Sequence, residues 1–209
     1  MVVMMNVLIT GFEPFNKELI NPSYEAVKLL PNEIDDIKIT KLQLPVTYNN
    51  AFEKVLSELN SNHYDVVLLV GQAGGRKGIT LEKVAINYNF ASIPDNDGVS
   101  LNHQKIISSG PDAYFTTLPI IRMERVLKEN NILSSISFSA GAFVCNNLMY
   151  LTLDYAKKCN TKVGFIHVPY SKEQVENKEN IPYMELNDIV KGLEICIKES
   201  VMEEDLVCQ

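Results

Sequence analysis

The sequence predicts an α/β fold with a mainly parallel sheet that helices cover on both sides. Short apolar runs alternate along the chain with longer amphipathic segments. Several of the short runs are apolar on both faces, as strands buried in a parallel sheet are. The longer segments repeat their apolar residues at intervals of three and four, which is the period of a helix packed on one side.

The individual elements follow from these two periods. We expect strands over Asn6–Thr10, Ile37–Val46, Tyr64–Val70, Ser135–Ser139 and Lys162–Val168. We expect helices over Pro22–Leu30, over Tyr48–Leu59 and from about Val144 to Tyr155. In this order of strand, helix and strand, successive strands lie parallel in one sheet.

Length and composition indicate one globular domain over residues 1–209. The 209 residues are 46% hydrophobic and 22% charged, which is enough for a single core. No internal repeat and no linker rich in Gly, Pro or Ser divides the chain. We expect the acidic segment 202–209 to form a flexible tail.

Charge and apolar patterning argue against nucleic-acid and membrane partners. The formal net charge is −7, from 26 acidic and 19 basic residues, and no basic cluster is present. The longest apolar runs are too short to cross a bilayer, and the first residues lack the basic flank of a secretion signal. The four cysteines are widely spaced, so we expect reduced thiols and a cytoplasmic protein.

Three loops and one histidine occupy the carboxyl ends of the expected strands. The loops are Gly11–Asn16, Gly71–Gly78 and Gly141–Asn147, and His167 closes the last strand. Parallel sheets place their functional residues at this edge. We therefore expect catalytic and ligand-binding residues in these segments.

Cys145 follows the small-residue turn of SAGAFVCNN and begins an amphipathic helix. Unpaired N–H groups and the helix dipole at such a start favour the thiolate, lower the pKa of a thiol and can hold an oxyanion. A buried structural cysteine is the other interpretation of this pattern. The remaining cysteines have weaker patterns: Cys159 lies at an expected helix end, Cys196 on the apolar stripe with Leu193 and Ile197, and Cys208 in the tail.

Two titratable residues are candidates for a base and its orienting partner. His167 ends the apolar strand of VGFIHVPY, where it is either a base beside a loop or a hydrogen-bonded core histidine. Glu82 lies in an alternating segment after the Gly-rich loop, where it either orients an imidazole or is a solvated acid. The three histidines lack metal-ligand spacing, so we expect no metal site.

The Gly-rich run GQAGGRKG is a weak phosphate signal, because it fits neither the dinucleotide fingerprint nor the P-loop. Its glycines would let backbone approach a small ligand, and Gln72 offers an amide donor and acceptor. Three aromatic residues in the strand-end loops, Phe12, Phe15 and Phe143, are either walls of an apolar pocket or ordinary core residues.

Taken together, these segments resemble the pyrrolidone carboxyl peptidases, the intracellular cysteine-type pyroglutamyl peptidases. The likeness runs from about Asn6 to Ser200, through the motifs TGFEPF, NPSYEAV, GQAGGRKGITLEKVAIN, IPDNDG, GPDAYFTTLP, SAGAFVCN and GFIHVPY. It implies a three-layer α/β/α sandwich with a mainly parallel, mixed central sheet. It also implies no cofactor, peptides with N-terminal pyroglutamate as substrates, and a homo-oligomer, often a tetramer.

Residue by residue, the resemblance implies a catalytic triad of Glu82, Cys145 and His167. The family's substrate pocket corresponds to Phe12, Phe15, Asn21, Gln72, Phe143 and Val144. Cys145 would attack the carbonyl that joins pyroglutamate to the next residue, and water would hydrolyse the resulting thioester with help from His167. The uncharged lactam needs apolar walls and an amide partner rather than a carboxylate.

The chain departs from the family at Phe90 and Ser92, where the family usually has an acid and an arginine. Loss of that cation predicts weaker activation of Cys145, whereas loss of both charges together is also consistent with the neutral loss of a salt bridge. Two other functions remain open on the residues alone. One is a catalytically weakened pyroglutamyl-peptide-binding homologue, and the other is a nucleoside phosphorylase-like transferase.

Overall fold

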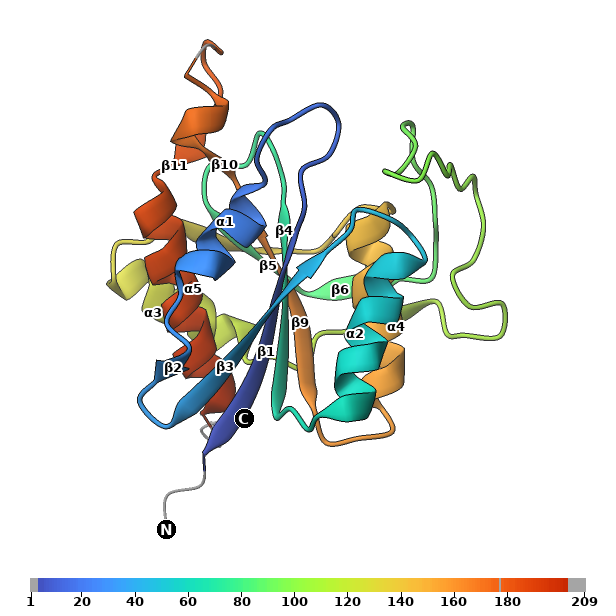
Figure 1. Cartoon of the computed structure of the whole chain (residues 1–209), viewed down its shortest axis with the longest axis horizontal. Helices are drawn as coiled ribbons and strands as arrows, with labels where there is room; N and C mark the ends of the chain where they lie inside the picture. Colours follow the sequence, from blue (N-terminus) through green and yellow to red (C-terminus); the bar gives the residue numbers. More distant parts are fainter. Residues whose placement is uncertain (1–3, 177, 203–209) are drawn as a thin grey trace.

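The central sheet is mixed and mostly parallel, as the sequence predicts (Figure 1). The computed structural model describes residues 4–176 and 178–202. Its sheet contains β1 (Met5–Phe12), β2 (Glu33–Ile34), β3 (Ile37–Leu44), β4 (Val66–Gln72), β5 (Ile79–Glu82), β8 (Ser134–Ser137) and β9 (Lys162–Val168), in the order β2-β3-β1-β4-β9-β5-β8. Neighbouring strands are parallel except for β2 with β3 and β5 with β9, which are antiparallel.

Helices cover both faces of this sheet. They are α1 (Pro22–Leu29), α2 (Asn50–Ser61), α3 (Ile120–Glu129), α4 (Val144–Ala156) and α5 (Leu186–Val201). Figure 1 shows α1, α3 and α5 on one face and α2 and α4 on the other. The fold class predicted from the sequence is therefore confirmed.

Strand side chains alternate between two hydrophobic cores, one on each face. On β1, Val7 and Ile9 belong to the core beneath α1, α3 and α5, whereas Leu8 and Phe12 belong to the core beneath α2 and α4. The period of two is the ordinary pleat of a strand. On β9 the same pleat places His167 on the face of Phe165, which belongs to the core beneath α2 and α4. His167 therefore faces the layer that contains α4.

Two short strand pairs flank the main sheet. β6 (Val84–Ile86) is antiparallel to β7 (Ala113–Phe115), and β10 (Tyr170–Ser171) is parallel to β11 (Tyr183–Met184). A 3₁₀ turn, η1 (Lys172–Gln174), follows β10 directly. β10 and η1 continue from the carboxyl end of β9.

The five predicted strands and three predicted helices are present, with shifts at their ends. β3 stops at Leu44 because Pro45 has no N–H to continue the ladder. The helix predicted from Tyr48 begins at Asn50, because Tyr48 and Asn49 form a turn before it. β5 corresponds to the alternating segment that holds Glu82. The elements that were not predicted are β2, β6, β7, β10, β11, α3 and α5.

The end of the chain is described only in part. α5 ends at Val201, and the predicted tail 202–209 lies outside the described residues beyond Met202, as does Cys208. None of the helices in the described part of the chain combines the length and apolar character that a membrane span requires.

Candidate active site

A small pocket lies at the carboxyl ends of β1, β4 and β9, where the predicted loops meet. Its volume is about 170 Å³, well below that of a site for a drug-sized ligand, so it suits a small group. The lining residues are Phe12, Phe15, Asn21, Val46, Gln72, Ala140, Phe143, Cys145 and His167. A thiol on α4 and an imidazole on β9 therefore share one site.

Cys145 is the second residue of α4, after a turn in which Gly141 adopts a φ of 79°. Phe143 occupies the N-cap position, and its side chain makes no capping hydrogen bond. The first N–H groups of α4 are therefore left as donors beside the pocket. Asn146 anchors this helix start, because its amide accepts from the N–H of Ile86 (2.9 Å) and donates to the carbonyl of Ile86 (2.9 Å).

A missing side chain on β4 makes room for the thiol. Gly71 pairs in register with His167 on β9. A Cβ at Gly71 would lie 3.1 Å from the sulfur of Cys145 and 2.7 Å from Cζ of Phe165. Because only glycine lacks that atom, it lets the sulfur lie against the strand pair that carries His167. In this Gly-rich loop, glycine thus serves close packing within the protein.

A buried carboxylate holds His167. Nδ1 of the imidazole lies 2.7 Å from Oε1 of Glu82, and the two side chains are 5% and 0% exposed. Glu82 ends β5, the antiparallel neighbour of β9, so the bond joins adjacent strands. With Nδ1 bound to the carboxylate, Nε2 is the ring nitrogen left for the pocket.

A cation contacts the same carboxylate oxygen. Nη1 of Arg76, from the Gly-rich loop, lies 2.6 Å from Oε1 of Glu82. Burial acts to raise the pKa of Glu82, but the hydrogen bond and charge of His167, with smaller contributions from Ser137 and Arg76, outweigh it and lower that pKa. Burial lowers the pKa of His167 despite the opposing effect of Glu82. An ionised carboxylate therefore lies beside an imidazole that is neutral at neutral pH.

The thiol contradicts one expectation from the sequence. Burial, followed by the charge of Glu82, raises the pKa of Cys145 to about 12, although Arg76 and the backbone N–H of Cys145 lower it. The helix start acts in the predicted direction, but desolvation of the charged form is the larger effect. In this structure the sulfur is consequently a thiol at neutral pH, and the expected low pKa is wrong.

Aromatic rings form the apolar walls of the pocket. Phe12 is buried, whereas Phe15 and Phe143 are partly exposed. The Phe143 ring meets Tyr48 edge-on, with centroids 5.4 Å apart and planes at 88°. This contact fixes the ring next to the start of α4. Val46 and Ala140 complete the apolar lining, and sequence reasoning missed both because their side chains carry no chemical signal.

Two predicted pocket residues have mainly structural contacts. Val144 is buried at the first position of α4 and is not among the lining residues. Asn21 lines the pocket, but its Oδ1 accepts from the N–H (3.1 Å) and hydroxyl (2.7 Å) of Ser23 and so caps α1. Its Nδ2 donates to the carbonyl of Glu13 (2.9 Å). Asn21 therefore fixes the loop that carries Phe15.

The amide of Gln72 is oriented by a neighbour that sequence reasoning missed. The N–H of Ser171 donates to Oε1 of Gln174 (3.2 Å), so the NH₂ group of Gln174 points the other way. Nε2 of Gln174 donates to Oε1 of Gln72 (2.9 Å). A backbone N–H is only a donor, which sets the direction of both amides. Gln72 is left with its NH₂ group as the donor available to the pocket.

Other candidate residues lie outside the pocket lining. Ser92 is exposed, and Phe90, which is 41% exposed, stacks on His103 with centroids 4.5 Å apart. Cys159 is exposed and Cys196 is buried on α5; both are free thiols. Across the described ranges, no group of three or more His, Cys, Asp or Glu side chains is placed to hold a metal ion.

The family match and the sequence relatives of this chain agree with one another. The family described as pyroglutamyl peptidase matches residues 5–203. The chain is 51% identical to a pyrrolidone-carboxylate peptidase of Brachyspira hyodysenteriae over 199 residues, covering 94% of this chain and 99% of the relative. It is 49% identical to a protein of the same name from Clostridium botulinum, covering 94% of this chain and 93% of the relative.

Solved structures agree with these sequence relatives. The pyroglutamyl peptidase I of Bacillus amyloliquefaciens superposes with a TM-score of 0.94 at 39% identity, covering 97% of this chain and 98% of that one. A mutant pyrrolidone carboxyl peptidase of Pyrococcus furiosus gives 0.91 at 37% identity, with 94% and 98% covered. The likeness therefore extends over nearly the whole chain.

Proposed function

The chain belongs to the pyroglutamyl peptidase family, and we propose that Cys145, His167 and Glu82 carry out its reaction. The protein is a cysteine peptidase that removes N-terminal pyroglutamate from peptides. The observation that carries the assignment of residues is the 2.7 Å bond from Nδ1 of His167 to Glu82, combined with the shared pocket of His167 and Cys145. Nucleophile, base and orienting acid are the three roles that acyl transfer requires.

The first half of the reaction transfers the pyroglutamyl group to sulfur. Nε2 of His167 accepts the thiol proton of Cys145 as the sulfur attacks the pyroglutamyl carbonyl. The uncapped N–H groups at the start of α4 hold the oxyanion that forms. The imidazolium then donates its proton to the leaving nitrogen, the C–N bond breaks, and a thioester on Cys145 remains. Glu82 stabilises the transient positive charge on the ring.

The second half returns the enzyme to its starting state. His167 accepts a proton from water as the water oxygen attacks the thioester carbonyl. The C–S bond breaks, the sulfur takes the proton back from His167, and free pyroglutamate leaves. No cofactor enters either half. A neutral imidazole is needed at the start of each half, which agrees with the lowered pKa of His167.

The pocket matches the chemistry of a lactam. Three phenylalanines provide flat apolar walls, and no carboxylate is among the lining residues, so the site does not select a charged α-amine. The oriented NH₂ group of Gln72 donates to the lactam carbonyl. A prolyl ring, which lacks the lactam carbonyl, would leave this donor unpaired, so the site discriminates against it.

The two alternative functions are not favoured. The hypothesis of a nucleoside phosphorylase-like transferase depended on a Gly-rich loop that binds phosphate. In the structure, a Cβ at Gly74 would lie 2.3 Å from the Tyr170 ring, and a Cβ at Gly78 would lie 2.2 Å from the Leu133 carbonyl oxygen. These glycines allow packing of the protein on itself. The reading as a catalytically weakened binder conflicts with the bonded Glu82–His167 pair beside a thiol.

We further propose a cytoplasmic homo-oligomer, a tetramer as the family resemblance implies. The described cysteines Cys145, Cys159 and Cys196 are all free, which fits a reducing compartment. Large apolar side chains are exposed near α3 and β8, among them Ile121 (72%), Leu133 (58%) and Phe138 (75%). Exposed apolar area of this kind is typical of subunit contacts.

Release of a fluorogenic amine from a pyroglutamyl substrate tests the assignment of residues. We expect Cys145→Ser and His167→Ala to lower kcat/KM by about a thousandfold or more, because each removes a group that takes part in bond making. Cys159→Ser and His103→Ala are matched controls outside the pocket and should retain the parent rate. A Cys145→Ser enzyme as fast as the parent would contradict the proposal.

Gln174→Leu tests how the lactam is recognised. The change removes the donor to Oε1 of Gln72 and frees that amide to rotate, so we expect KM for a pyroglutamyl substrate to rise by about tenfold. A prolyl substrate, which lacks the lactam carbonyl, should remain poor with parent and variant alike. Unchanged KM with unchanged stability would exclude the orienting role.

The oligomer is tested by sedimentation of the parent and a Leu133→Asp, Phe138→Asp double variant. We expect the parent to sediment as four chains and the variant as fewer, since charge on an apolar contact is unfavourable. A monomeric parent at all concentrations would contradict the proposed assembly without affecting the peptidase assignment.

A further inference from the structure

One oxygen of the buried carboxylate at the site is shared by two positively polarised groups. Nδ1 of His167 (2.7 Å) and Nη1 of Arg76 (2.6 Å) both contact Oε1 of Glu82, while Oε2 is buried without a hydrogen-bond partner among the described residues. Glu82 is fully buried. The Gly-rich loop thus supplies the cation of Arg76 to the carboxylate of Glu82.

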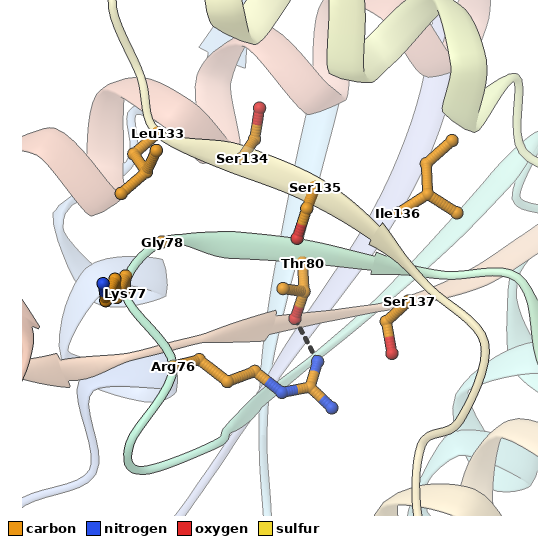
Figure 2. Close-up of a pocket in the computed structure, with 9 residues that line it drawn as sticks. All are labelled: Arg76, Lys77, Gly78, Thr80, Leu133, Ser134, Ser135, Ile136 and Ser137. Atoms are coloured by element: carbon orange, nitrogen blue, oxygen red, sulfur yellow. Dashed lines mark hydrogen bonds between the residues drawn. The ribbon is translucent and has the colours of Figure 1, made fainter.

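The guanidinium of Arg76 is fixed by three different partners. Besides Glu82, Nη1 donates to the hydroxyl of Thr80, and Nη2 donates to the carbonyl of Ser139 (3.3 Å). Thr80 and Glu82 are two residues apart on β5, so they share a face of the strand. Figure 2 shows the guanidinium of Arg76 below β5, directed at the Thr80 hydroxyl. Both residues line a surface pocket of about 490 Å³. The side chain is 28% exposed.

The position of this cation matters because the base must be neutral at rest. A buried carboxylate alone would favour the protonated imidazole, which has no lone pair to accept the thiol proton. The charges that act on His167 are those of Glu82, which favours protonation, and Arg76, which opposes it. The same two charges act on Cys145, again with opposite signs. Arg76 offsets Glu82 at both reacting groups.

We propose that Arg76 is a positioning residue that pairs with Glu82, fixes the carboxylate against His167 and keeps the imidazole in its neutral, proton-accepting form. This inference rests on the proposed function. It gives Glu82 enough negative charge to stabilise the imidazolium that forms during the reaction, but not enough to hold a proton on His167 beforehand. The reacting groups need no contact with Arg76 for this effect.

The test is the pH dependence of kcat/KM for Arg76→Met and Arg76→Gln, measured from about pH 5 to about pH 9 with a pyroglutamyl fluorogenic amide. Without the cation, Glu82 acts unopposed and the pKa of His167 rises, so the acidic limb of the profile moves to higher pH. We expect kcat/KM to fall about tenfold near pH 6 and by a smaller factor near pH 8. Arg76→Lys keeps the charge and should restore most of the parent profile.

A neighbouring cation provides the control, and a direct measurement supports the kinetics. Lys77→Met removes a charge from the same loop and should keep the parent profile. NMR titration of the His167 ring should show a higher pKa in Arg76→Gln than in the parent. Loss of activity by one factor at every pH, a change confined to KM, or an unshifted His167 titration would overturn the inference. An inactive parent would instead refute the proposed function.

Discussion

The hydrogen bond between Glu82 and His167 is the interaction on which the site depends. It joins side chains on two antiparallel neighbours in a sheet that is otherwise mostly parallel, and both side chains are buried. A buried carboxylate is costly unless it is paired and hydrogen-bonded. The fold meets that requirement with the imidazole on one side and Arg76 on the other. The direction of β5 is therefore part of the proposed catalytic arrangement.

Electrostatic balance distinguishes this site from one that holds a preformed thiolate. Burial raises the pKa of Cys145 to about 12 and lowers that of His167, so both resting groups are neutral. In the reaction that we propose, attack requires transfer of a proton from the sulfur of Cys145 to Nε2 of His167 as the new bond forms. The charges created in that step meet groups already in place: the N–H donors of α4 for the oxyanion and Glu82 for the imidazolium. The scaffold is organised for the charged transition state rather than for a charged resting state.

The sequence was sufficient to predict the mainly parallel sheet, the helices α1, α2 and α4, and the position of Cys145 at a helix start, because these depend on local periods and turns. The low thiol pKa expected from that helix start was wrong, since desolvation depends on neighbours from β4 and β9. The contacts of Arg76 and Gln174 were not predictable either. Each depends on a partner from another strand or loop, and a lone Arg or Gln in a polar loop carries no signal of its partner.

Family resemblance supplied what local patterns left open. From local sequence alone, Glu82 could also be a solvated acid and His167 a hydrogen-bonded core histidine. Only the long motifs around them favoured a catalytic role. The structure adds a physical reason for the proposed pairing, which is register. β5 and β9 pair Thr80 with His167 and Glu82 with Phe165, so Glu82 and His167 are diagonal neighbours within hydrogen-bond reach. Gly71 leaves space for the sulfur of Cys145 against the same strands. The site therefore depends on how the strands pair in the sheet as well as on the sequence motifs.

Mass spectrometry of the acid-quenched enzyme tests the central claim most directly. An activated pyroglutamyl ester makes transfer to sulfur fast, so hydrolysis of the thioester limits turnover and the covalent enzyme accumulates. The account predicts one pyroglutamyl group on the peptide that contains Cys145, and none when Cys145 is replaced by alanine. Steady turnover with no adduct, or with the adduct on another residue, would contradict it.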